Sequence, residues 1–315
     1  MFDSELSKFK TIDLRAYAAG QGYQLDRKES WKGSAVMRHP NGDKIIIKRD
    51  AADGHFVYFS VHRDDDKGGS IIDFVQNRQR LSLGAVRKEL RPWIGAAPVP
   101  VPSFPTLQKT SRDRMKVEAE YAKMQDATRH PYLENERALP SSLLALERFA
   151  GRIRIDARGN AVFPHFDQEG LCGFEIKNKG FTGFSSGGTK GLWLSHGLPD
   201  DNRFVICESS VDALSHAALF PDEHARYASI GGKPNPVQPE LIRAAIARMP
   251  VGSEIVSAMD ADEDGAKLAI VVRRAFELSG RHDLRFSVQE PSGAKDWNDL
   301  LRTKPRALLP EVAPP

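Results

Sequence analysis

Cysteine is almost absent from this sequence. Only Cys172 and Cys207 occur among 315 residues, and both stand in apolar surroundings far apart along the chain. This spacing excludes a disulfide framework and a zinc site built from paired cysteines. We therefore expect no zinc, and a reducing, cytoplasmic setting.

Long apolar runs are absent as well. No stretch reaches the roughly 18 apolar residues that a membrane span requires. The first five residues, MFDSE, lack the basic and apolar regions of a secretion signal. The sequence predicts a protein that is neither secreted nor membrane-embedded.

A strong excess of one charge is also lacking. The 45 Lys and Arg residues nearly balance the 42 Asp and Glu residues, and the net charge of +3 does not by itself establish nucleic-acid binding. Residues 201–315 are nevertheless acidic, with 17 acidic and 14 basic side chains. A weakly basic front and an acidic rear fit a polyanionic substrate that one part holds and the other processes.

The first 94 residues predict a small α+β module. Residues 12–19 have the spacing of a short helix, and turns at 40–42 and 53–54 separate three strand-like runs. The expected antiparallel strands and the two helices after them cover residues 35–38, 44–48, 55–61, 70–78 and 83–90. Residues 95–110 include GAAPVPVPSFP, whose prolines and lack of charge predict a semi-rigid linker.

Two further regions follow the linker. Residues 111–200 combine a charged helical stretch with three strand-like runs, which predict an antiparallel meander over 152–156, 161–166 and 171–177. In residues 201–305 strands and helices alternate, which is the pattern of a parallel sheet flanked by helices. Residues 306–315 form a tail. The predicted fold class is α/β in the C-terminal domain, preceded by two α+β regions.

Carboxylates stand at the ends of two predicted strands. Glu208 follows one apolar run, and Asp260, Asp262 and Asp264 follow another. Ligands of open α/β sheets gather at the carboxyl ends of the strands. Carboxylates brought within 4 Å repel by roughly 4 kcal/mol per pair at an effective dielectric near 20. The group therefore indicates a divalent cation, and Mg²⁺ suits oxygen ligands that leave room for a phosphate.

Helix capping is the alternative explanation for these acids. Asp212 lies about one helical turn from Glu208, so the two carboxylates can either face one cation or interact with free amides at the helix start. For this pair both interpretations stay open. For Asp260 and Asp262 a metal role is favoured, because the two acids alternate out of a buried strand before Gly265 permits a tight turn.

Three lysines are candidates for phosphate contacts. Lys233 follows Gly231-Gly232 between a predicted strand and a predicted helix, where amides and ammonium can meet a phosphate; an ordinary loop is the alternative. Lys177 and Lys190 stand in strand-like surroundings. Taken as residues alone, both are expected to face solvent.

The acidic motifs resemble those of a known domain. A glutamate after the first strand and a DxD after the third, here Glu208 and 260–262, are typical of the Toprim domain shared by DnaG-type primases, type IA and II topoisomerases and some nucleases. With a second acid four residues after the glutamate, here Asp212, the motif is most similar to that of bacterial primases. The resemblance implies a third acidic element at Asp296 or Asp299, since Asn298 stands where a second aspartate is usual.

The resemblance extends upstream of the acidic motifs. Residues 151–195 are similar to the part of the DnaG core that precedes its Toprim fold, and residues 132–139 are similar to the YLxxRG element before that part. What this implies is that Lys190 and Lys177 contribute positive charge to an incoming nucleotide or to the product strand.

The first module resembles the primase zinc ribbon without its metal ligands. His39, His55 and His62 are too irregularly spaced, and lack thiolate partners, to replace such a site. We expect the module to meet single-stranded DNA through phosphate contacts and base stacking, or else to use the same side chains as core and solubilising surface. The candidate DNA contacts are Arg38, Lys48, Arg63, Trp31 and Tyr58.

The whole layout looks like the LtrC-like Toprim proteins of conjugative and integrative elements. It implies a metal-dependent, primase-like nucleotidyltransferase that uses Mg²⁺ or Mn²⁺ and nucleoside triphosphates on single-stranded DNA, and that a helicase or relaxase brings to DNA. Asp260 and Asp262 are expected as main ligands, Glu208 as ligand or proton acceptor, and Asp212, Asp264 and Asp296 as further acids. Two alternatives stay open: a Toprim nuclease, and a DNA-binding protein without turnover.

Overall fold

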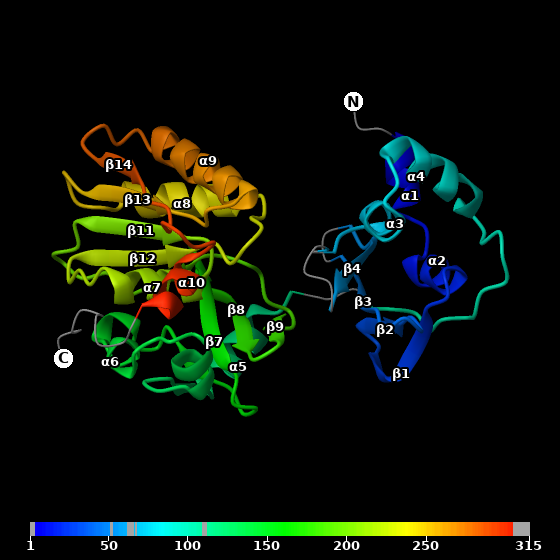
Figure 1. Cartoon of the computed structure of the whole chain (residues 1–315), viewed down its shortest axis with the longest axis horizontal. Helices are drawn as coiled ribbons and strands as arrows, with labels where there is room; N and C mark the ends of the chain where they lie inside the picture. Colours follow the sequence, from blue (N-terminus) through cyan, green and yellow to red (C-terminus); the bar gives the residue numbers. More distant parts are fainter. Residues whose placement is uncertain (1–3, 51–52, 62–65, 67, 109–111, 305–315) are drawn as a thin grey trace. The chain divides into compact units, whose positions relative to one another are not determined.

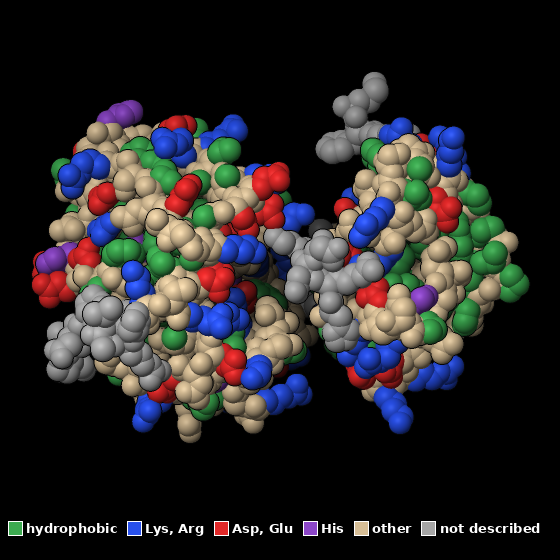
Figure 2. Space-filling view, viewed as in Figure 1, with side chains coloured by type: hydrophobic (Ala, Val, Ile, Leu, Met, Phe, Trp, Pro, Cys, Tyr) green, Lys and Arg blue, Asp and Glu red, His purple; other side chains and the backbone are tan. Residues whose placement is uncertain are grey.

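The computed structural model describes residues 4–50, 53–61, 66, 68–108 and 112–304. The chain divides into two units, residues 1–111 and 112–315, and each is described by itself. Figure 2 shows lysine, arginine and acidic side chains intermixed over the visible surface of both units. Every helix among the described residues is too short or too polar to cross a bilayer.

The first unit is an antiparallel sheet packed against helices (Figure 1). Its four strands lie in chain order and pair as neighbours. The predicted strands and helices are present, and an additional first strand of charged, largely exposed sequence joins them. The elements are α1 (Ser4–Phe9), α2 (Leu14–Gly20), β1 (Gln24–Trp31), β2 (Ser34–Arg38), β3 (Lys44–Arg49), β4 (Phe56–Ser60), α3 (Ile71–Gln79), α4 (Leu83–Leu90) and the 3₁₀ turn Arg91–Trp93.

A buried ion cluster stabilises the first unit. Arg78 on α3 lies 2.9 Å from Asp43 and also pairs with Asp66, and all three side chains are at most 8% exposed. The hydroxyl groups of Tyr23 and Tyr58 donate to the same two carboxylates. Because both carboxylates are paired and hydrogen-bonded, the cluster joins the sheet to α3 without an uncompensated buried charge.

Part of the predicted linker packs onto the first unit. Residues 99–108 form neither helix nor strand, as expected. Leu107 is nonetheless buried in the core, Val101 and Phe104 pack against it, and the amide of Gln108 donates to the carbonyl of Lys32 at 2.8 Å. Apolar side chains between the prolines explain this difference from a free linker.

The second unit begins with short helices and an antiparallel sheet. The sheet order is β5-β6-β7-β8-β9, so the three predicted strands are present with one more strand at each edge. The elements are α5 (Arg114–Ala122), β5 (Gln125–Asp126), the π-helical turn Tyr132–Glu136, α6 (Ser141–Leu144), the 3₁₀ turn Glu147–Phe149, β6 (Arg154–Ile155), β7 (Ala161–Asp167), β8 (Gly170–Asn178) and β9 (Phe181–Phe184).

A second sheet of five strands forms the rest of this unit. Its order is β10-β12-β11-β13-β14, with all neighbours parallel except the edge strand β10, which the sequence did not predict. The elements are β10 (Trp193–Leu194), β11 (Arg203–Cys207), α7 (Ser210–Leu219), β12 (Ala225–Ser229), α8 (Gln238–Ala247), β13 (Glu254–Ala258), α9 (Glu263–Leu278), β14 (Arg285–Val288) and α10 (Trp297–Thr303).

Both faces of the parallel sheet are covered. Val205 and Cys207 pack with α7 and α10, whereas Phe204 and Ile206 pack with α8 and α9 (Figure 1). Burial on both faces explains the continuous apolar run of β11. Each buried aliphatic side chain of this kind contributes about 1.5–3 kcal/mol. The carboxyl ends of the strands are thereby held at one rigid edge.

Candidate functional site

Two adjacent parallel strands bring the main acids together. Cys207 at the end of β11 pairs with Ala258 at the end of β13, so Glu208 and Asp260 leave the same sheet edge one and two residues later. Asp262 follows as the N-cap of α9, and Asp296 is the N-cap of α10. The carboxyl edge of the sheet therefore collects acids from three loops.

Asp260 lies at the centre of this group. Burial, and after it the charges of Asp212, Glu208, Asp296 and Asp262 in that order, together raise its pKa to about 8. Oδ1 of Asp260 is buried and accepts no hydrogen bond from the described residues. A cation would remove both the repulsion and the missing contact, since carboxylate oxygens are the ligands that Mg²⁺ and Mn²⁺ prefer.

Asp212 is the most deeply buried acid of the group. Burial raises the pKa of its carboxyl group, and the charge of Asp296 acts in the same direction, while Ser209, Lys177 and the amide of Asn298 oppose the rise. Its Oδ2 lies 2.5 Å from the hydroxyl of Ser209, the N-cap of α7. The first turn of α7 thus fixes Asp212 beside Asp296.

Capping and a metal role are compatible at two positions. Oδ1 of Asp262 accepts from the amide of Gly265 at 2.8 Å, and Oδ1 of Asp296 accepts from the amide of Asp299 at 2.6 Å. One oxygen of each carboxylate is used in this way. The other oxygen of Asp262 lies 3.7 Å from the ammonium of Lys295. Capping orients each carboxylate and leaves its second oxygen at the sheet edge.

Two candidate acids are not brought into the group. Asp264 lies in the first turn of α9, where its side chain is half-exposed and Oδ1 is 3.3 Å from the ammonium of Lys267. The side chain of Asp299 is also about half-exposed and lies 3.4 Å from Arg302. The helical turn after each cap carries these side chains toward solvent, so Asp296, and not Asp299, interacts with Asp260 and Asp212.

Lys177, on β8, and Lys190, in the loop between β9 and β10, interact electrostatically with the acids. The charge of Lys177 opposes the rise in the pKa of Asp212. Burial lowers the pKa of Lys190, and Glu175 and Glu208 oppose that shift. The ammonium of Lys190 donates to the carbonyl of Lys233 at 2.7 Å. Both lysines are thus partly buried cations beside the carboxylates, rather than the solvent-facing charges expected from their residue type alone.

The Gly231-Gly232-Lys233 loop does not offer its first amides to a phosphate. The N–H groups of Gly231 and Gly232 both donate to the backbone carbonyl of Glu208, at 2.8 and 3.1 Å. Lys233 contributes its carbonyl to Lys190, while its side chain is exposed. The loop is therefore a turn that holds Glu208 in place, which is the ordinary-loop alternative.

Asn298 is a site residue whose role the sequence did not reveal. It is 2% exposed, and its Nδ2 donates to the carbonyl of Arg137 at 2.8 Å and to Oγ of Ser215 at 2.9 Å. Its backbone N–H donates to Oδ1 of Asp212 at 3.2 Å. An aspartate has no donor for the first two contacts at neutral pH. Only the departure from the acidic motif signalled this position.

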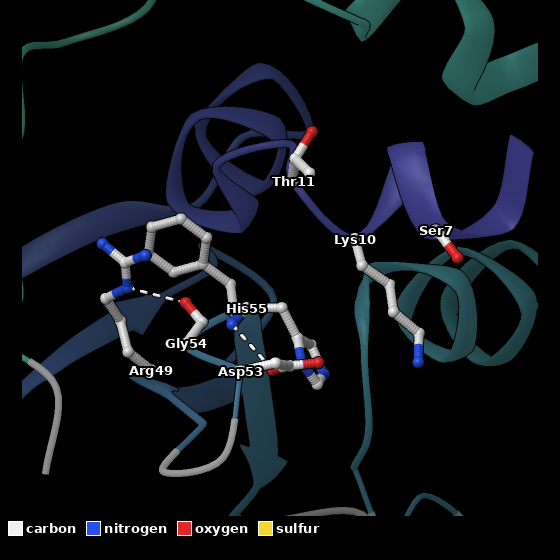
Figure 3. A pocket seen from close by; sticks show the side chains of 8 residues that line it. Ser7, Lys10, Thr11, Arg49, Asp53, Gly54 and His55 are labelled. Atoms are coloured by element: carbon white, nitrogen blue, oxygen red, sulfur yellow. Dashed lines mark hydrogen bonds and ion pairs between the residues drawn. The ribbon is translucent and has the colours of Figure 1, made fainter. Parts of the chain in front are cut away.

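Another group of possible ligands lies in the first unit. Asp50, Asp53 and His55 are the only three histidine, cysteine or acidic residues in the described part of the chain whose ligand atoms all lie within 4.8 Å of one another. Asp53 and His55 pair with each other beside a pocket of about 370 Å³ that Lys10 and Arg49 also line (Figure 3). The group is partly exposed and already ion-paired, so it gives no ground for a metal. The sheet-edge acids are spread more widely than this group.

The candidate DNA contacts of the first unit differ in whether their side chains are exposed, ion-paired or buried. Trp31 is 55% exposed, and the ammonium of Lys48 lies 5.7 Å from the ring centre of Phe59, which is 48% exposed. Arg38 is paired with Asp26 at 2.8 Å. Tyr58 is 0% exposed and its hydroxyl donates to Asp66, so the prediction that it stacks on bases is wrong.

The alternation of β4 explains this correction. Tyr58 points into the core, so its neighbours Val57 and Phe59 point to the other face of the sheet. Phe59 is the exposed aromatic that the sequence analysis missed. Arg63, the remaining candidate, lies outside the described residues.

Two family models match the second unit. Residues 131–202 match a model described as a protein of unknown function, DUF3991, and residues 205–301 match a model described as Toprim-like. A comparison with curated proteins finds no significant match.

Solved structures of primases are similar to the chain. The primase fragment of the bacteriophage T7 primase-helicase protein is 14% identical, with 80% of this chain and 87% of that chain covered and a TM-score of 0.38. A DNA primase domain from Pseudomonas aeruginosa is 20% identical, with 50% of this chain and 49% of that chain covered and a TM-score of 0.33. Similarity at this level carries no information about substrate or activity.

The family model confirms the resemblance that the acidic motifs indicated. The matched residues 205–301 begin within β11, run through β14 and include the acids at the carboxyl ends of these strands. The C-terminal part of this chain is a Toprim-like domain, preceded by a DUF3991 region.

Proposed function

We propose that the protein is a metal-dependent, primase-like nucleotidyltransferase that acts on single-stranded DNA. One observation carries the proposal: partly buried cations from the DUF3991 region interact electrostatically with the acids of the Toprim-like edge. Lys177 acts on Asp212, and Lys190 acts on Glu208. Acids alone suit any reaction that needs metal, whereas acids with adjoining cations suit a substrate rich in phosphate.

The acids have distinct roles in this proposal. Asp260 and Asp262 are the main metal ligands. Asp260 has a buried oxygen without a hydrogen-bond partner among the described residues, and Asp262 uses only Oδ1 in its cap, which leaves Oδ2 for a cation. Glu208 is a ligand or proton acceptor, and Asp212 and Asp296 complete the charge. Bound Mg²⁺ or Mn²⁺ supplies charge stabilisation to the reacting phosphate and lowers the pKa of the attacking hydroxyl.

Lys177 and Lys190 neutralise phosphate charge in this proposal. Their side chains are already ordered by Glu175 and by the carbonyl of Lys233, respectively. Ordered cations cost less conformational entropy on binding than free surface lysines. The triphosphate of an incoming nucleotide is the ligand that fits such fixed charges.

The first unit is proposed to hold the single strand. Trp31 and Phe59 offer exposed rings, and Lys48 supplies charge next to Phe59. Stacking of bases on aromatic rings and contacts to phosphates are the usual means of binding single strands. The resemblance to LtrC-like proteins further suggests a role in mobile-element DNA, with a helicase or relaxase as partner.

A single incubation tests the proposal. The full chain is mixed with an end-labelled single strand, nucleoside triphosphates and Mg²⁺ or Mn²⁺, and the products are resolved by length. New short strands support the proposal, shortened label indicates a nuclease, and neither product indicates a binding protein. Asp260→Asn is expected to abolish synthesis, whereas Asp264→Asn, an acid outside the group, is the matched control and retains it.

A further inference from the structure

Arginines gather at the opposite edge of the Toprim-like sheet. Arg226 lies at the amino end of β12, whereas the acids lie at the carboxyl ends of the neighbouring strands. Arg152, from the loop before β6, and Arg226 meet at residues 196–197: Nη2 of Arg152 lies 3.3 Å from Nδ1 of His196, and the guanidinium of Arg226 lies against Gly197. We define Arg152 and Arg226 as the arginine cluster. Like charges brought together in this way repel unless an anion joins them.

Arg226 is joined to no carboxylate of the described residues by a hydrogen bond or ion pair. It makes no hydrogen bond or ion pair with any described residue, and its Nε is buried. Its guanidinium lies against Gly197, where an added β-carbon would be 3.5 Å from its Cζ, Nε and Nη1 atoms. Cζ also lies 5.8 Å from the ring centre of Phe204. The side chain is therefore packed in place while its hydrogen-bonding capacity is unused.

Arg152 is held in a similar way. Its Cζ lies 4.4 Å from the ring centre of Phe166, and its Nη2 donates to Nδ1 of His196 at 3.3 Å. Nε2 of His196 donates to the carbonyl of Ala150 at 2.7 Å, which assigns the proton to Nε2 and leaves Nδ1 as a neutral acceptor. Nε of Arg152 is buried and donates to no described residue. Among the described residues, no carboxylate forms an ion pair with this guanidinium either.

The nearby carboxylate is already used. Asp201 is 3% exposed, lies 2.9 Å from Arg148 and also accepts from the amide of Leu198 at 2.8 Å. The charge of Asp201 also attracts Arg226, but no hydrogen bond or ion pair joins these two side chains. The cluster thus keeps its positive charge in a partly buried setting, where a cation without a partner is costly.

We propose that the arginine cluster is a binding site for a phosphate group, separate from the metal site. A guanidinium offers parallel N–H donors that match two oxygens of a phosphate, and aromatic rings beneath it keep the fork in place. The phosphate can belong to a nucleic-acid backbone or to a free nucleotide or polyphosphate. The arginine cluster lies at the amino ends of the strands, whereas the acids lie at the carboxyl ends. The cluster is therefore a second contact point and not a part of the reacting centre.

The test measures binding without metal, so that the acids at the other edge do not contribute. The full chain in EDTA is titrated with inorganic tripolyphosphate by calorimetry and with a fluorescent oligo-dT by anisotropy. The variants are Arg152→Gln with Arg226→Gln, the charge-conserving Arg226→Lys, and Arg274→Gln. Arg274 is an exposed arginine of α9 without a hydrogen bond or ion pair to the described residues, and serves as the matched control.

The double glutamine variant is expected to bind at least one probe about tenfold more weakly, since hydrogen bonds to charged groups are the strong ones. Arg226→Lys is expected to recover only part of the loss, and Arg274→Gln to bind as the parent does. Loss confined to tripolyphosphate identifies a free polyphosphate site. Loss of oligo-dT binding, with a salt slope smaller by about 0.7 for each phosphate contact removed, identifies a backbone site.

Chemical modification gives a second measurement that needs no variant. Phenylglyoxal labelling of the parent, followed by mass spectrometry, reports the reactivity of each arginine with and without the probe. Protection of Arg152 and Arg226, with Arg274 unchanged, supports the site. Equal labelling in both conditions, or equal binding of both probes by the parent and the double variant, overturns it.

Discussion

The side-chain amide of Asn298 donates a hydrogen bond of 2.8 Å to the backbone carbonyl of Arg137. This bond joins the last helix of the Toprim-like domain to the DUF3991 region. The same amide reaches Ser215, and the backbone of Asn298 reaches Asp212. One buried side chain therefore ties an acid of the sheet edge to the domain that supplies the lysines.

Replacing Asn298 by aspartate is expected to destabilise the second unit by about 1–3 kcal/mol, because two buried acceptors lose their donor. Urea unfolding of Asn298→Asp against the parent measures the change. Asp299→Asn, one position along and half-exposed, is the control and should leave the unfolding free energy within about 0.5 kcal/mol of the parent. A variant Asn298→Asp as stable as the parent would show that the amide donor is dispensable.

The raised pKa of Asp260 predicts a pH dependence of stability in the absence of metal. Burial, followed by the neighbouring acids, raises this pKa from 3.8 to about 8. Between those values the folded state holds a proton that the unfolded state has lost, so stability falls as pH rises from about 4 to about 8. Urea unfolding of EDTA-treated protein at several pH values measures the slope.

Asp260→Asn is the informative control for this slope, since an amide resembles the protonated acid and does not titrate. Its unfolding free energy should fall less steeply over the same pH range than that of the parent. Identical slopes in parent and variant would mean that Asp260 titrates normally and that the acids do not act on one another as described.

Neighbouring aromatics of β4 should respond in opposite ways. Phe59→Ala is expected to weaken single-stranded DNA binding by about 1–3 kcal/mol, the usual contribution of one stacked base, with little change in stability. Tyr58→Phe removes a buried hydrogen bond to Asp66 and should lower stability by about 1 kcal/mol while DNA binding is kept. Anisotropy and urea unfolding separate the two effects, and the reverse assignment would refute the outward-facing role of Phe59.

The ion cluster of the first unit predicts stability that does not depend on metal. Arg78→Met leaves Asp43 and Asp66 buried without their cation and should destabilise this unit by about 3–5 kcal/mol. A zinc chelator should have no effect on unfolding of the parent. Unfolding of the first unit by chelator alone would show that a metal, and not Arg78, holds the sheet to α3.

Local sequence patterns were sufficient to predict the elements whose structure follows from neighbouring residues along the chain. The strands and helices after Pro199 were predicted because buried parallel strands are continuous apolar runs, and the acids after β11 and β13 follow from strand direction. β1 was missed because its sequence, QLDRKESW, is charged and largely exposed. β10 was missed because it has two residues and exists only through its pairing with β12.

Side-chain roles that depend on distant partners could not be predicted in this way. Tyr58 and Phe59 are neighbours in an alternating strand, and only packing against α3 decides which of them is buried. The amides of Gly231 and Gly232 are used by the carbonyl of Glu208, which no local pattern indicates. Asn298 has partners 161 and 83 residues away along the chain.

Metal binding by the acids around Asp260 is the central claim, and titration with Mn²⁺ tests it most directly. Calorimetry on the parent, Asp260→Asn and Asp264→Asn, in buffers of different ionisation enthalpy, measures affinity and proton release together. We expect the parent and Asp264→Asn to bind Mn²⁺ alike, with about one proton released at pH 7 because Asp260 must lose its proton. Asp260→Asn should bind at least tenfold more weakly; equal binding by all three proteins would contradict the account.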